Sequence, residues 1–157
     1  TAAELEQARM VFVAGFVQCM LAMTILGGAT TLLLGASWGS PLGVALVCTS
    51  AVIAALGIST LVISFTNSAE VAGAASSAVA ITLGVLGGTF SPTAQGPEIM
   101  GTIALFTPHG WFMRGLGDMQ GGGTVADGLQ SVGVLLAMGL ITGGIGMARA
   151  RRLVKAR

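Results

Sequence analysis

The side chains that could carry out chemistry are few in this sequence, and they form no familiar catalytic pattern. His109 is the one histidine, and no serine, cysteine or carboxylate accompanies it at a spacing typical of a catalytic motif. One imidazole is also too few for a metal site, which takes three or four protein ligands. We therefore expect His109 to cap a helix or to lie at an interface, and we expect no catalytic or metal-binding residue.

Two other features resemble reactive or binding groups only in part. Cys19 and Cys48 lie in hydrophobic stretches, with neither a CxxC spacing nor a nearby histidine, so we interpret them as buried thiols without a function. Residues 121–124 (GGGT) lack the GK[ST] with which a phosphate loop holds phosphates and magnesium. We expect a flexible hinge there, with Thr124 as the N-cap of a following helix, and no cofactor.

The composition is that of an integral membrane protein. The 157 residues include only seven Lys or Arg and six Asp or Glu, against 54% hydrophobic residues, which excludes an ordinary soluble domain. The 25 glycines suit membrane helices that approach one another through small residues. Two GxxxG pairs, Gly84 with Gly88 and Gly139 with Gly143, favour packing within the chain over a dimer face. The net charge of +1 indicates no nucleic acid partner.

Four hydrophobic stretches are each near the length of about 20 residues with which a helix crosses a bilayer. Short polar breaks separate the first three, and a longer interrupted stretch precedes the last. We predict an all-α membrane protein with four transmembrane helices in a single transmembrane domain, residues 1–157. The predicted spans are residues 10–34, 42–65, 71–90 and 125–147, and Trp38 is an interfacial anchor between the first two.

Residues 91–120 are too interrupted to cross a bilayer and too apolar for an ordinary solvated loop. Pro97 can begin a helix, and Thr107-Pro108 should end it and allow another to begin, because proline fits a helix start but disrupts its interior. We predict two half-length helices, residues 97–106 and 109–119, that form an exterior re-entrant helical hairpin before the last span. Non-helical backbone at membrane depth must be enclosed by protein or by a water-filled cavity.

The basic residues indicate the orientation of the spans. Five of the seven lie in the last nine positions, and a short basic tail beside a hydrophobic span is typical of the cytoplasmic side. Such a tail can also contact anionic membrane lipids. We therefore predict a multi-pass protein of the cell (inner) membrane, with both termini of this segment cytoplasmic and residues 35–41 and 91–124 outside. The five basic residues are Arg149, Arg151, Arg152, Lys155 and Arg157.

Two charged residues flank the break in the predicted hairpin, and their roles stay open. Glu98 lies near the start of the first half-helix, where a carboxylate complements the helix dipole. Alternatively, Glu98 pairs with Arg114 across the hairpin, because charges inside a membrane seek partners. Asp118 competes for Arg114, since it lies four residues further along the same half-helix.

The first ten residues, TAAELEQARM, form a helical surface segment that leads into the membrane. Glu4, Glu6 and Arg9 lie in this segment, and Glu70 lies in the turn before the third span, on the same predicted side. A cytoplasmic partner can dock near them. The segment has neither an initiator methionine nor the basic region of a signal peptide, so we interpret the chain as the interior of a longer protein.

Four motifs at the joints of the predicted elements, taken in order, resemble a known family. They are residues 38–41 (WGSP), residues 66–70 (TNSAE), residues 87–92 (GGTFSP) and residues 105–111 (LFTPHGW). The last motif has an apolar residue, Thr, Pro, two further residues and an aromatic between the half-helices. This order resembles the C-terminal two thirds of an ABC transporter permease of the type-2 exporter class, and the resemblance covers nearly the whole chain.

The resemblance implies a fragment of a six-span permease, with the four spans similar to the third to sixth. It implies export of an amphiphilic or lipophilic substrate, such as a drug or a lipid, along a pathway formed with a second permease copy or a homologue. A separate ATP-binding ABC subunit would hydrolyse ATP, so the permease would not be an enzyme. The implied outer gate comprises Pro97, Glu98, Thr107, Pro108, Trp111 and Arg114, and the implied ATPase-proximal residues are Glu4, Glu6, Arg9 and Glu70.

Two other interpretations of the same pattern stay open. One is an ATP-independent channel or secondary transporter whose broken exterior segment is a selectivity element. The four spans have no Asp, Glu, Lys, Arg or His near their middle, where ion-coupled carriers usually place such groups. The other is an accessory structural membrane subunit. Flux without ATP would favour the first, and a naturally complete four-span chain would favour the second.

Overall fold

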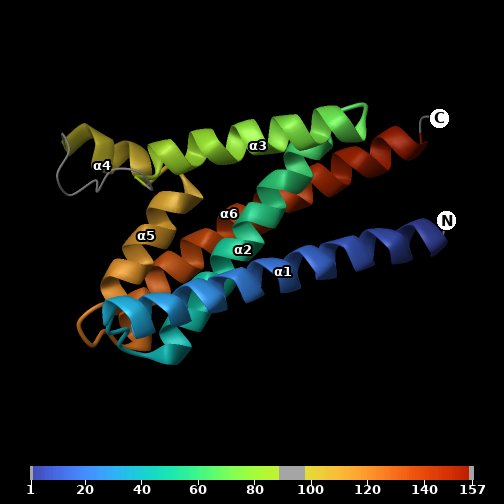
Figure 1. The fold of residues 1–157 in the computed structure, drawn as a ribbon. Helices are drawn as coiled ribbons and strands as arrows, with labels where there is room; N and C mark the ends of the chain where they lie inside the picture. Colours follow the sequence, from blue (N-terminus) through green and yellow to red (C-terminus); the bar gives the residue numbers. More distant parts are fainter. Residues whose placement is uncertain (1, 89–97, 156–157) are drawn as a thin grey trace.

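The structure, a computed structural model, describes residues 2–88 and 98–155. Within these residues it consists of helices joined by short connections, with no strand, which confirms the predicted all-α class. The helices are α1 (Ala2–Leu34), α2 (Pro41–Ile63), α3 (Ala69–Leu86), α4 (Glu98–Ala104), α5 (Pro108–Met119) and α6 (Val125–Lys155) (Figure 1).

Four of the described helices are long and apolar enough to cross a membrane, as predicted. α1 and α6, with 33 and 31 residues, extend beyond their apolar parts. The last span was predicted to end at residue 147, but neither proline nor glycine follows before Lys155, so the helix continues. The apolar parts are Phe12–Leu34, Pro41–Ile63, Ala69–Leu86 and Val125–Arg152.

α2 and α3 each begin after a serine that satisfies a free N–H group of the first turn. The hydroxyl of Ser40 accepts from the N–H of Gly43 at 3.2 Å, and a proline follows at the first helical position. The hydroxyl of Ser68 accepts from the N–H of Val71, also at 3.2 Å. Serine is favoured at this position because its short side chain replaces the missing helical acceptor. α3 therefore begins at Ala69, slightly before the predicted start at residue 71.

Glycine ends α3 earlier than the hydrophobic pattern predicted. The N–H of Gly87 donates to the carbonyl of Leu83 at 2.8 Å, and Gly88 follows with φ of 81°. Glycine adopts this left-handed conformation at little cost, and it is common just beyond a helix end. The predicted span to residue 90 is therefore too long, because Gly87 and Gly88 form a turn; residues 89 and 90 lie outside the described residues. Gly88 is not part of a helical GxxxG surface, contrary to the prediction.

α2 and α6 pack closely against each other through glycine. A Cβ on Gly139 would lie only 2.7 Å from the carbonyl oxygen of Ile53 and 2.9 Å from Cα of Ala54. A Cβ on Gly57 of α2 would overlap the backbone of Gly139. A Cβ on Gly143 would lie 3.3 Å from Cα of Gly57. The predicted packing of the Gly139 and Gly143 pair within the chain is confirmed, because both glycines let the two backbones approach.

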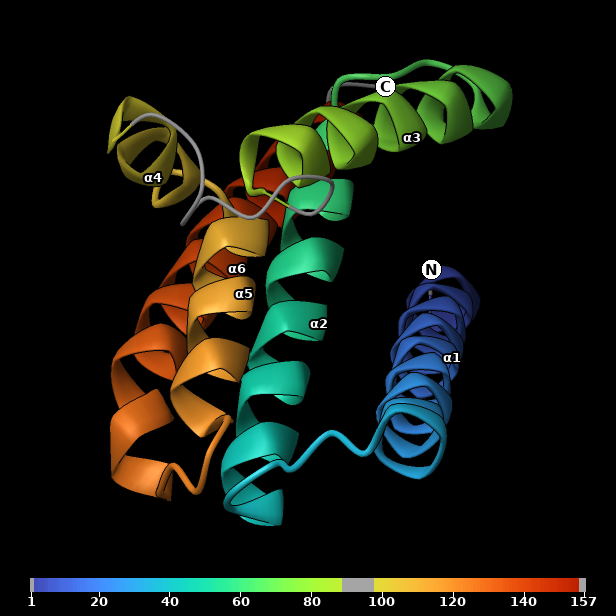
Figure 2. The same cartoon turned by 60° about the vertical axis from the view of Figure 1, so that its left-hand side comes forward.

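α5 packs against both α2 and α6, and the three helices form the core (Figure 2). Gly115 of α5 permits the contact, because a Cβ there would lie 2.9 Å from Cβ of Ser131 and 3.0 Å from Cγ1 of Val47. The indole of Trp111 extends from α5 into the same core. Buried hydrophobic residues of the core include Val47, Val52, Ala54, Trp111, Met119 and Leu135.

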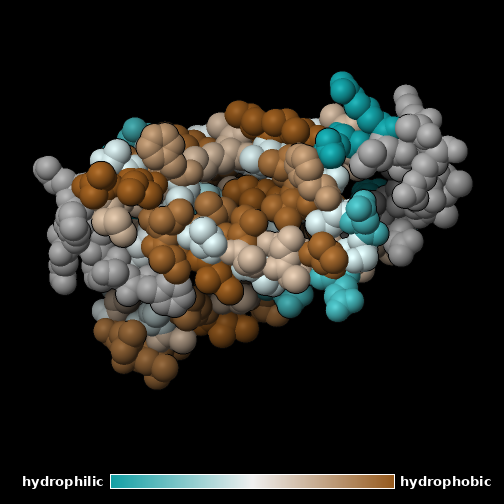
Figure 3. Space-filling view, turned by 90° about the horizontal axis from the view of Figure 1, so that it is seen from above, coloured by the Kyte–Doolittle hydropathy of each residue, from teal (hydrophilic) through white to brown (hydrophobic). Residues whose placement is uncertain are grey.

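α1 and α3 lie at the edge of this core and leave most of their hydrophobic surface exposed. α1 contacts α2, and α3 crosses the core obliquely, so that its end reaches the start of α5 (Figure 1, Figure 2). Leu32 on α1 is 84% exposed and Ile81 on α3 is 63% exposed. Hydrophobic side chains cover the middle of the molecule in Figure 3, whereas hydrophilic ones gather near one end. Such a surface suits contact with lipid or with further helices.

Candidate functional site

The elbow between α4 and α5, residues 105–111, is organised by Thr107. Its hydroxyl donates to the carbonyl of Ala104 at 2.8 Å and accepts from the N–H of Gly110 at 3.0 Å. The backbone N–H of Thr107 also donates to Ala104, at 2.9 Å. Thr107 thus ends α4 and caps α5, while Pro108 at the first helical position has no N–H that needs a partner.

Trp111 closes the elbow from the first turn of α5. Its indole Nε1 donates to the carbonyl of Leu105 at 2.7 Å, so that a backbone acceptor between the two helices is satisfied. Gly110 lets α4 come close, because a Cβ there would overlap the carbonyl of Ala104. The elbow therefore satisfies much of its own broken backbone, which a bend inside hydrocarbon requires.

The end of α3 rests on the same elbow. A Cβ on Gly87 would overlap Cβ of His109, and it would lie 2.8 Å from both the Gly110 nitrogen and Oγ1 of Thr107. Such distances leave no room for any side chain at Gly87. The turn after α3, the end of α4 and the start of α5 therefore meet at one point, in backbone contact.

α5 extends from this point to the end of the molecule at which α2 begins. At the elbow, Pro108 lines the same cavity as Val52 and Ala55, which lie near the middle of α2. At its other end, the N–H of Gly39, just before α2, donates to the carbonyl of Met119 at 2.8 Å. α5 has 12 residues, and a helix of this length rises about 18 Å, little more than half of a bilayer core. α5 therefore runs beside one half of α2.

Arg114 projects from α5 toward neutral partners. Its guanidinium lies 5.2 Å from the ring centroid of Trp111, and its Nη2 donates to Oε1 of Gln130 at 3.4 Å. In the described part of the chain it contacts these residues and not Asp118, the competing partner suggested by the sequence. Pro97 and the side chain of Glu98 lie outside the described residues. A pair between Glu98 and Arg114 therefore stays a prediction.

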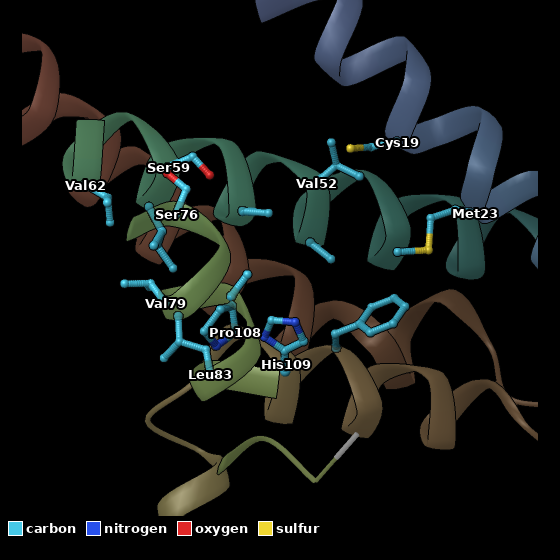
Figure 4. A pocket seen from close by; sticks show the side chains of 15 residues that line it. Cys19, Met23, Val52, Ser59, Val62, Ser76, Val79, Leu83, Pro108 and His109 are labelled. Carbon is cyan, nitrogen blue, oxygen red and sulfur yellow. The ribbon is translucent and has the colours of Figure 1, made fainter. Parts of the chain in front are cut away.

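A cavity of about 190 Å³ lies beside the elbow, between α2, α3 and α5, with α1 at its edge (Figure 4). Its wall is mostly aliphatic and includes Val79 and Leu83 of α3. His109 also lines it, so this side chain does not cap α5, a role that Thr107 fills. Nδ1 of His109 and Oγ of Ser76 are both buried, and neither has a hydrogen-bond partner in the described part of the chain.

Arg149 joins α6 to α2 at the opposite end of the molecule. Its Nε donates to the carbonyl of Ser64 at 3.2 Å, and its guanidinium lies 4.1 Å from the ring centroid of Phe65. The turn between α2 and α3 is thereby held beside the basic end of α6. The start of α1 lies at this same end (Figure 1).

The residues predicted to approach an ATPase lie at this charged end. Glu6 and Arg9 are exposed on α1, and Glu70 is exposed in the first turn of α3. The side chain of Glu4 lies outside the described residues. The structure therefore brings the described members of the set to one end, on two separate helices.

Two minor predictions need correction. Cys19 is exposed at the edge of the cavity, where little covers α1, so the prediction of a buried thiol is wrong for this residue; Cys48 is half-buried. Thr124 directly precedes α6 as predicted, but its hydrogen bond has the opposite direction. Its N–H and its hydroxyl both donate to Oδ2 of Asp127 at 2.8 Å.

Sequence reasoning did not single out Ser76 or the contact of Arg149. Ser76 is one of many small residues in the third span, and its place in the cavity wall depends on how α3 packs beside α2 and α5. The partner of Arg149 is a backbone carbonyl 85 positions away, which no side-chain pattern reveals. The signal available in the sequence for the cavity was His109, an isolated histidine among apolar residues.

The fold and the elbow define a multi-pass membrane protein in which the second of two short helices joined at the elbow packs against a tightly joined pair of long helices. The chain is 30% identical over 141 residues to the linearmycin resistance permease protein LnrN of Bacillus subtilis (strain 168). The match covers 89% of this chain and 36% of that protein, so the chain spans about a third of the length of its relative. The match confirms the resemblance to the C-terminal part of an ABC transporter permease.

No protein-family model matches the chain, and no solved structure gives a significant match.

Proposed function

We propose that this chain forms part of the membrane-spanning permease of an ATP-driven ABC exporter. The observation that carries the proposal is the match of 89% of the chain to a resistance permease. Export of a harmful compound is a direct way in which a permease confers resistance, and we extend that role to this chain. Its substrate is amphiphilic or lipophilic, such as a drug or a lipid, and a separate ATP-binding subunit hydrolyses ATP.

The charged end of the molecule is proposed to be cytoplasmic and to receive the ATPase. The basic residues at the C-terminal end of α6 favour this side of the membrane. Arg149 binds the residue that follows α2 there, so a displacement of the turn between α2 and α3 by the ATPase would also displace α6. Glu4, Glu6, Arg9 and Glu70 are the proposed contacts near the ATPase. Both ends of this segment then lie in the cytoplasm, and the protein spans the cell (inner) membrane.

The elbow and α5 are proposed to form the outer gate. α5 begins beside the middle of α2 and ends beside the start of α2, so a membrane-spanning α2 would place the elbow near half depth. This geometry supports a re-entrant hairpin that opens to the exterior. The internal hydrogen bonds of the elbow are those that a bend at this depth needs. The proposed gate residues are Pro97, Glu98, Thr107, Pro108, Trp111 and Arg114.

A second permease copy, or a homologue, is proposed to complete the pathway. The exposed apolar sides of α1 and α3 support this, because they offer surface for further helices as well as for membrane lipids. ATP binding and hydrolysis would shift the assembly between two arrangements by favouring one of them through differential contacts.

The test is reconstitution of the full-length protein in lipid vesicles with the ATPase encoded beside it. We expect the two to co-purify, the permease to increase ATP hydrolysis, and a lipophilic fluorescent dye or lipid to be moved only when ATP is present. An ATPase with an inactivated nucleotide site is the matched control. Failure to associate and to stimulate hydrolysis would contradict the proposal, and dye flux without ATP would favour a channel or secondary transporter.

A further inference from the structure

Arg114 is an exposed cation that connects α5 to α6. Its Nη2 donates to Oε1 of Gln130 on α6 at 3.4 Å, and its guanidinium lies 5.2 Å from the ring centroid of Trp111. Both partners are neutral, and among the side chains that the structure describes no carboxylate bonds to it. A charge within a membrane is costly unless it meets a partner, so the surroundings of this guanidinium favour an anion.

Two backbone hydrogen bonds fix the height of Arg114 relative to α2. The N–H of Gly39 donates to the carbonyl of Met119 at 2.8 Å, and the N–H of Ser40 donates to that of Gly123 at 3.0 Å, so α5 ends where α2 begins. Arg114 precedes Met119 by five residues, which is about 7.5 Å of helix. α2 has 23 residues, and a helix of this length rises about 34 Å, slightly more than a hydrocarbon core of about 30 Å. Arg114 therefore lies just inside the core, and its long side chain can reach the phosphate layer.

Asp118 lies one helical turn nearer the end of α5 and gives this surface a second charge. It is exposed and follows Arg114 by four residues, so the two Cβ atoms are about 5–6 Å apart on one side of the helix. Helical side chains lean toward the start of their helix, and the guanidinium accordingly lies near Trp111, on the side away from Asp118. A cation thus lies near the core and an anion lies further out.

A phospholipid head group that ends in an ammonium carries its charges in the complementary order. Its phosphate is joined to the glycerol, near the hydrocarbon, and its ammonium lies beyond the phosphate. The guanidinium can bind phosphate oxygens through charge-assisted hydrogen bonds, and the amide of Gln130 can donate a further one. The carboxylate of Asp118 can accept from the ammonium, and it would repel a head group that is only anionic.

α6 offers apolar surface for hydrocarbon on the side of Gln130 that faces the middle of the membrane. Gly133, Ala137 and Ile141 follow Gln130 at intervals of three, seven and eleven residues, so all four share one side of the helix. The three apolar residues are exposed, and a Cβ on Gly133 would meet no atom within 4 Å. The first two of them are small, which lets an acyl chain lie close to the helix.

We propose that Arg114 and Gln130 bind the phosphate of a phospholipid whose head group ends in a primary ammonium. Asp118 pairs with the ammonium, and an acyl chain lies along residues 133–141 of α6. The inference rests on the proposed function, which places this end of α5 in the outer leaflet. It deepens that function, because the bound lipid would join the proposed gate helix to α6 and make the gate sensitive to membrane composition.

The experiment uses the full-length permease in phosphatidylcholine vesicles. Two lipid probes with the same photoreactive acyl chain are compared, a phosphatidylethanolamine and a phosphatidylglycerol, and labelled peptides are identified by mass spectrometry. We expect the phosphatidylethanolamine to label residues 133–141 about tenfold more, the preference that one hydrogen bond between charged groups provides. Equal labelling by the two probes, or no labelling of this stretch, would overturn the inference.

Variants test the role given to each charge. Arg114→Gln should reduce labelling by both probes about tenfold, and Arg114→Lys should restore part of it. Asp118→Asn should remove the preference for phosphatidylethanolamine while both probes still label α6, which also shows that the variant is folded. Asp127→Asn is the matched control, because this exposed carboxylate near the start of α6 already accepts from the N–H and the hydroxyl of Thr124. Equal loss of preference in Asp118→Asn and Asp127→Asn would overturn the inference.

Two further arms separate the lipid from a partner within the chain and from the proposed function. Glu98→Gln should leave labelling unchanged, whereas an increase would show that Glu98 holds Arg114 and would overturn the inference. ATP-driven export in the presence of the ATPase, without labelling that depends on Arg114, would overturn the inference alone. Labelling that depends on Arg114, without stimulation of the ATPase, would support the lipid site and contradict the exporter.

Discussion

The pair α2 and α6 and the elbow between α4 and α5 are held together in different ways. In the pair, Gly57 and Gly139 bring two backbones into contact over long helices. At the elbow, close backbone contact is confined to Gly87 and Gly110, and hydrogen bonds from Thr107 and Trp111 fix a bend between short helices. Close packing resists gradual deformation, whereas a bend held by separate bonds can change when those bonds break.

The difference suggests which part of the molecule moves. The pair has the features of a fixed frame that carries force from the charged end, where Arg149 joins its two helices. The elbow, with the end of α3 resting on it through Gly87, has the features of an adjustable part. Substitutions in the two regions should therefore have different consequences, large for stability in the pair and larger for transport at the elbow.

Gly139→Leu should break the pair and have the largest effect on stability. The new side chain would overlap the backbone at Ile53 and Ala54, which neither helix can relieve without separating. We expect a loss of about 3 kcal/mol or more in the free energy of unfolding, at the upper end of overpacking costs. The measurement is denaturant unfolding of the full-length protein in detergent.

The control for this change is Gly144→Leu on the same helix. Gly144 is exposed, and a Cβ there meets no atom within 4 Å. The Gly144→Leu variant should have the same free energy of unfolding as the unsubstituted protein. Equal losses at the two positions would show that α6 tolerates no large side chain anywhere, and the importance of the glycine contact would be refuted.

Thr107→Val should destabilise the elbow and cause the second largest loss in the free energy of unfolding. The substitution keeps the shape but removes the hydroxyl that caps α5 and bonds to Ala104. Loss of a cap costs about 1–2 kcal/mol, and the same unfolding measurement should detect it. Thr24→Val is the control, because the hydroxyl of Thr24 is exposed and bonds only to Met20 within α1. If Thr24→Val lowers the free energy of unfolding as much as Thr107→Val does, the hydroxyl of Thr107 contributes no more than that of an ordinary helical threonine.

Trp111→Phe should reduce stability by a smaller amount, because it removes one hydrogen bond of the elbow while an aromatic ring stays in the core. The lost bond runs from Nε1 to the carbonyl of Leu105, and its removal should cost about 1 kcal/mol. Trp38→Phe is a matched control, because Nε1 of Trp38 has no partner in the described residues. We expect little change there. A larger loss for Trp38→Phe than for Trp111→Phe would contradict the role given to this bond.

Pro108→Ala should have the smallest effect on stability and a clear effect on export. Alanine fits the first turn of α5, so the free energy of unfolding should fall by less than about 1 kcal/mol. The alanine N–H and freer φ would let the two short helices shift or join, which would disturb the proposed gate. Export and ATPase association are measured at equal membrane abundance. Normal export by this variant would contradict the proposal that the elbow forms part of the outer gate.

The sequence predicted the elements of this fold better than their contacts. Hydrophobic length identified the four long helices, and Thr107-Pro108 marked the place where one short helix ends and the next begins, because local capping and proline geometry act within a few residues. The GxxxG spacing correctly predicted the packing of Gly139 against α2. The same spacing gave a wrong prediction for Gly88, which lies in the turn after α3 with a positive φ.

The site was less predictable because its parts come from distant segments. Ser76 and His109 share a cavity only because α3 crosses back to the start of α5, and no spacing in the sequence encodes that crossing. The exposure of Cys19 likewise depends on how little of α1 is covered. The charge of Arg114 suggested an ion pair, whereas its neighbours are an aromatic ring and an amide.

Distances between spin labels in the full-length protein show whether the elbow moves while the pair of α2 and α6 stays fixed. One pair of spin labels joins α3 to α5 at the exposed positions Val85 and Met113, and a second joins α2 to α6 at the exposed positions Leu42 and Leu129. The labels are attached to cysteines introduced into the otherwise cysteine-free full-length protein, which is studied in lipid with the proposed ATPase. Addition of ATP should change the distance distribution between α3 and α5 and leave that between α2 and α6 unchanged. A shift between α2 and α6 as large as that between α3 and α5, or no shift at either pair, would contradict the account.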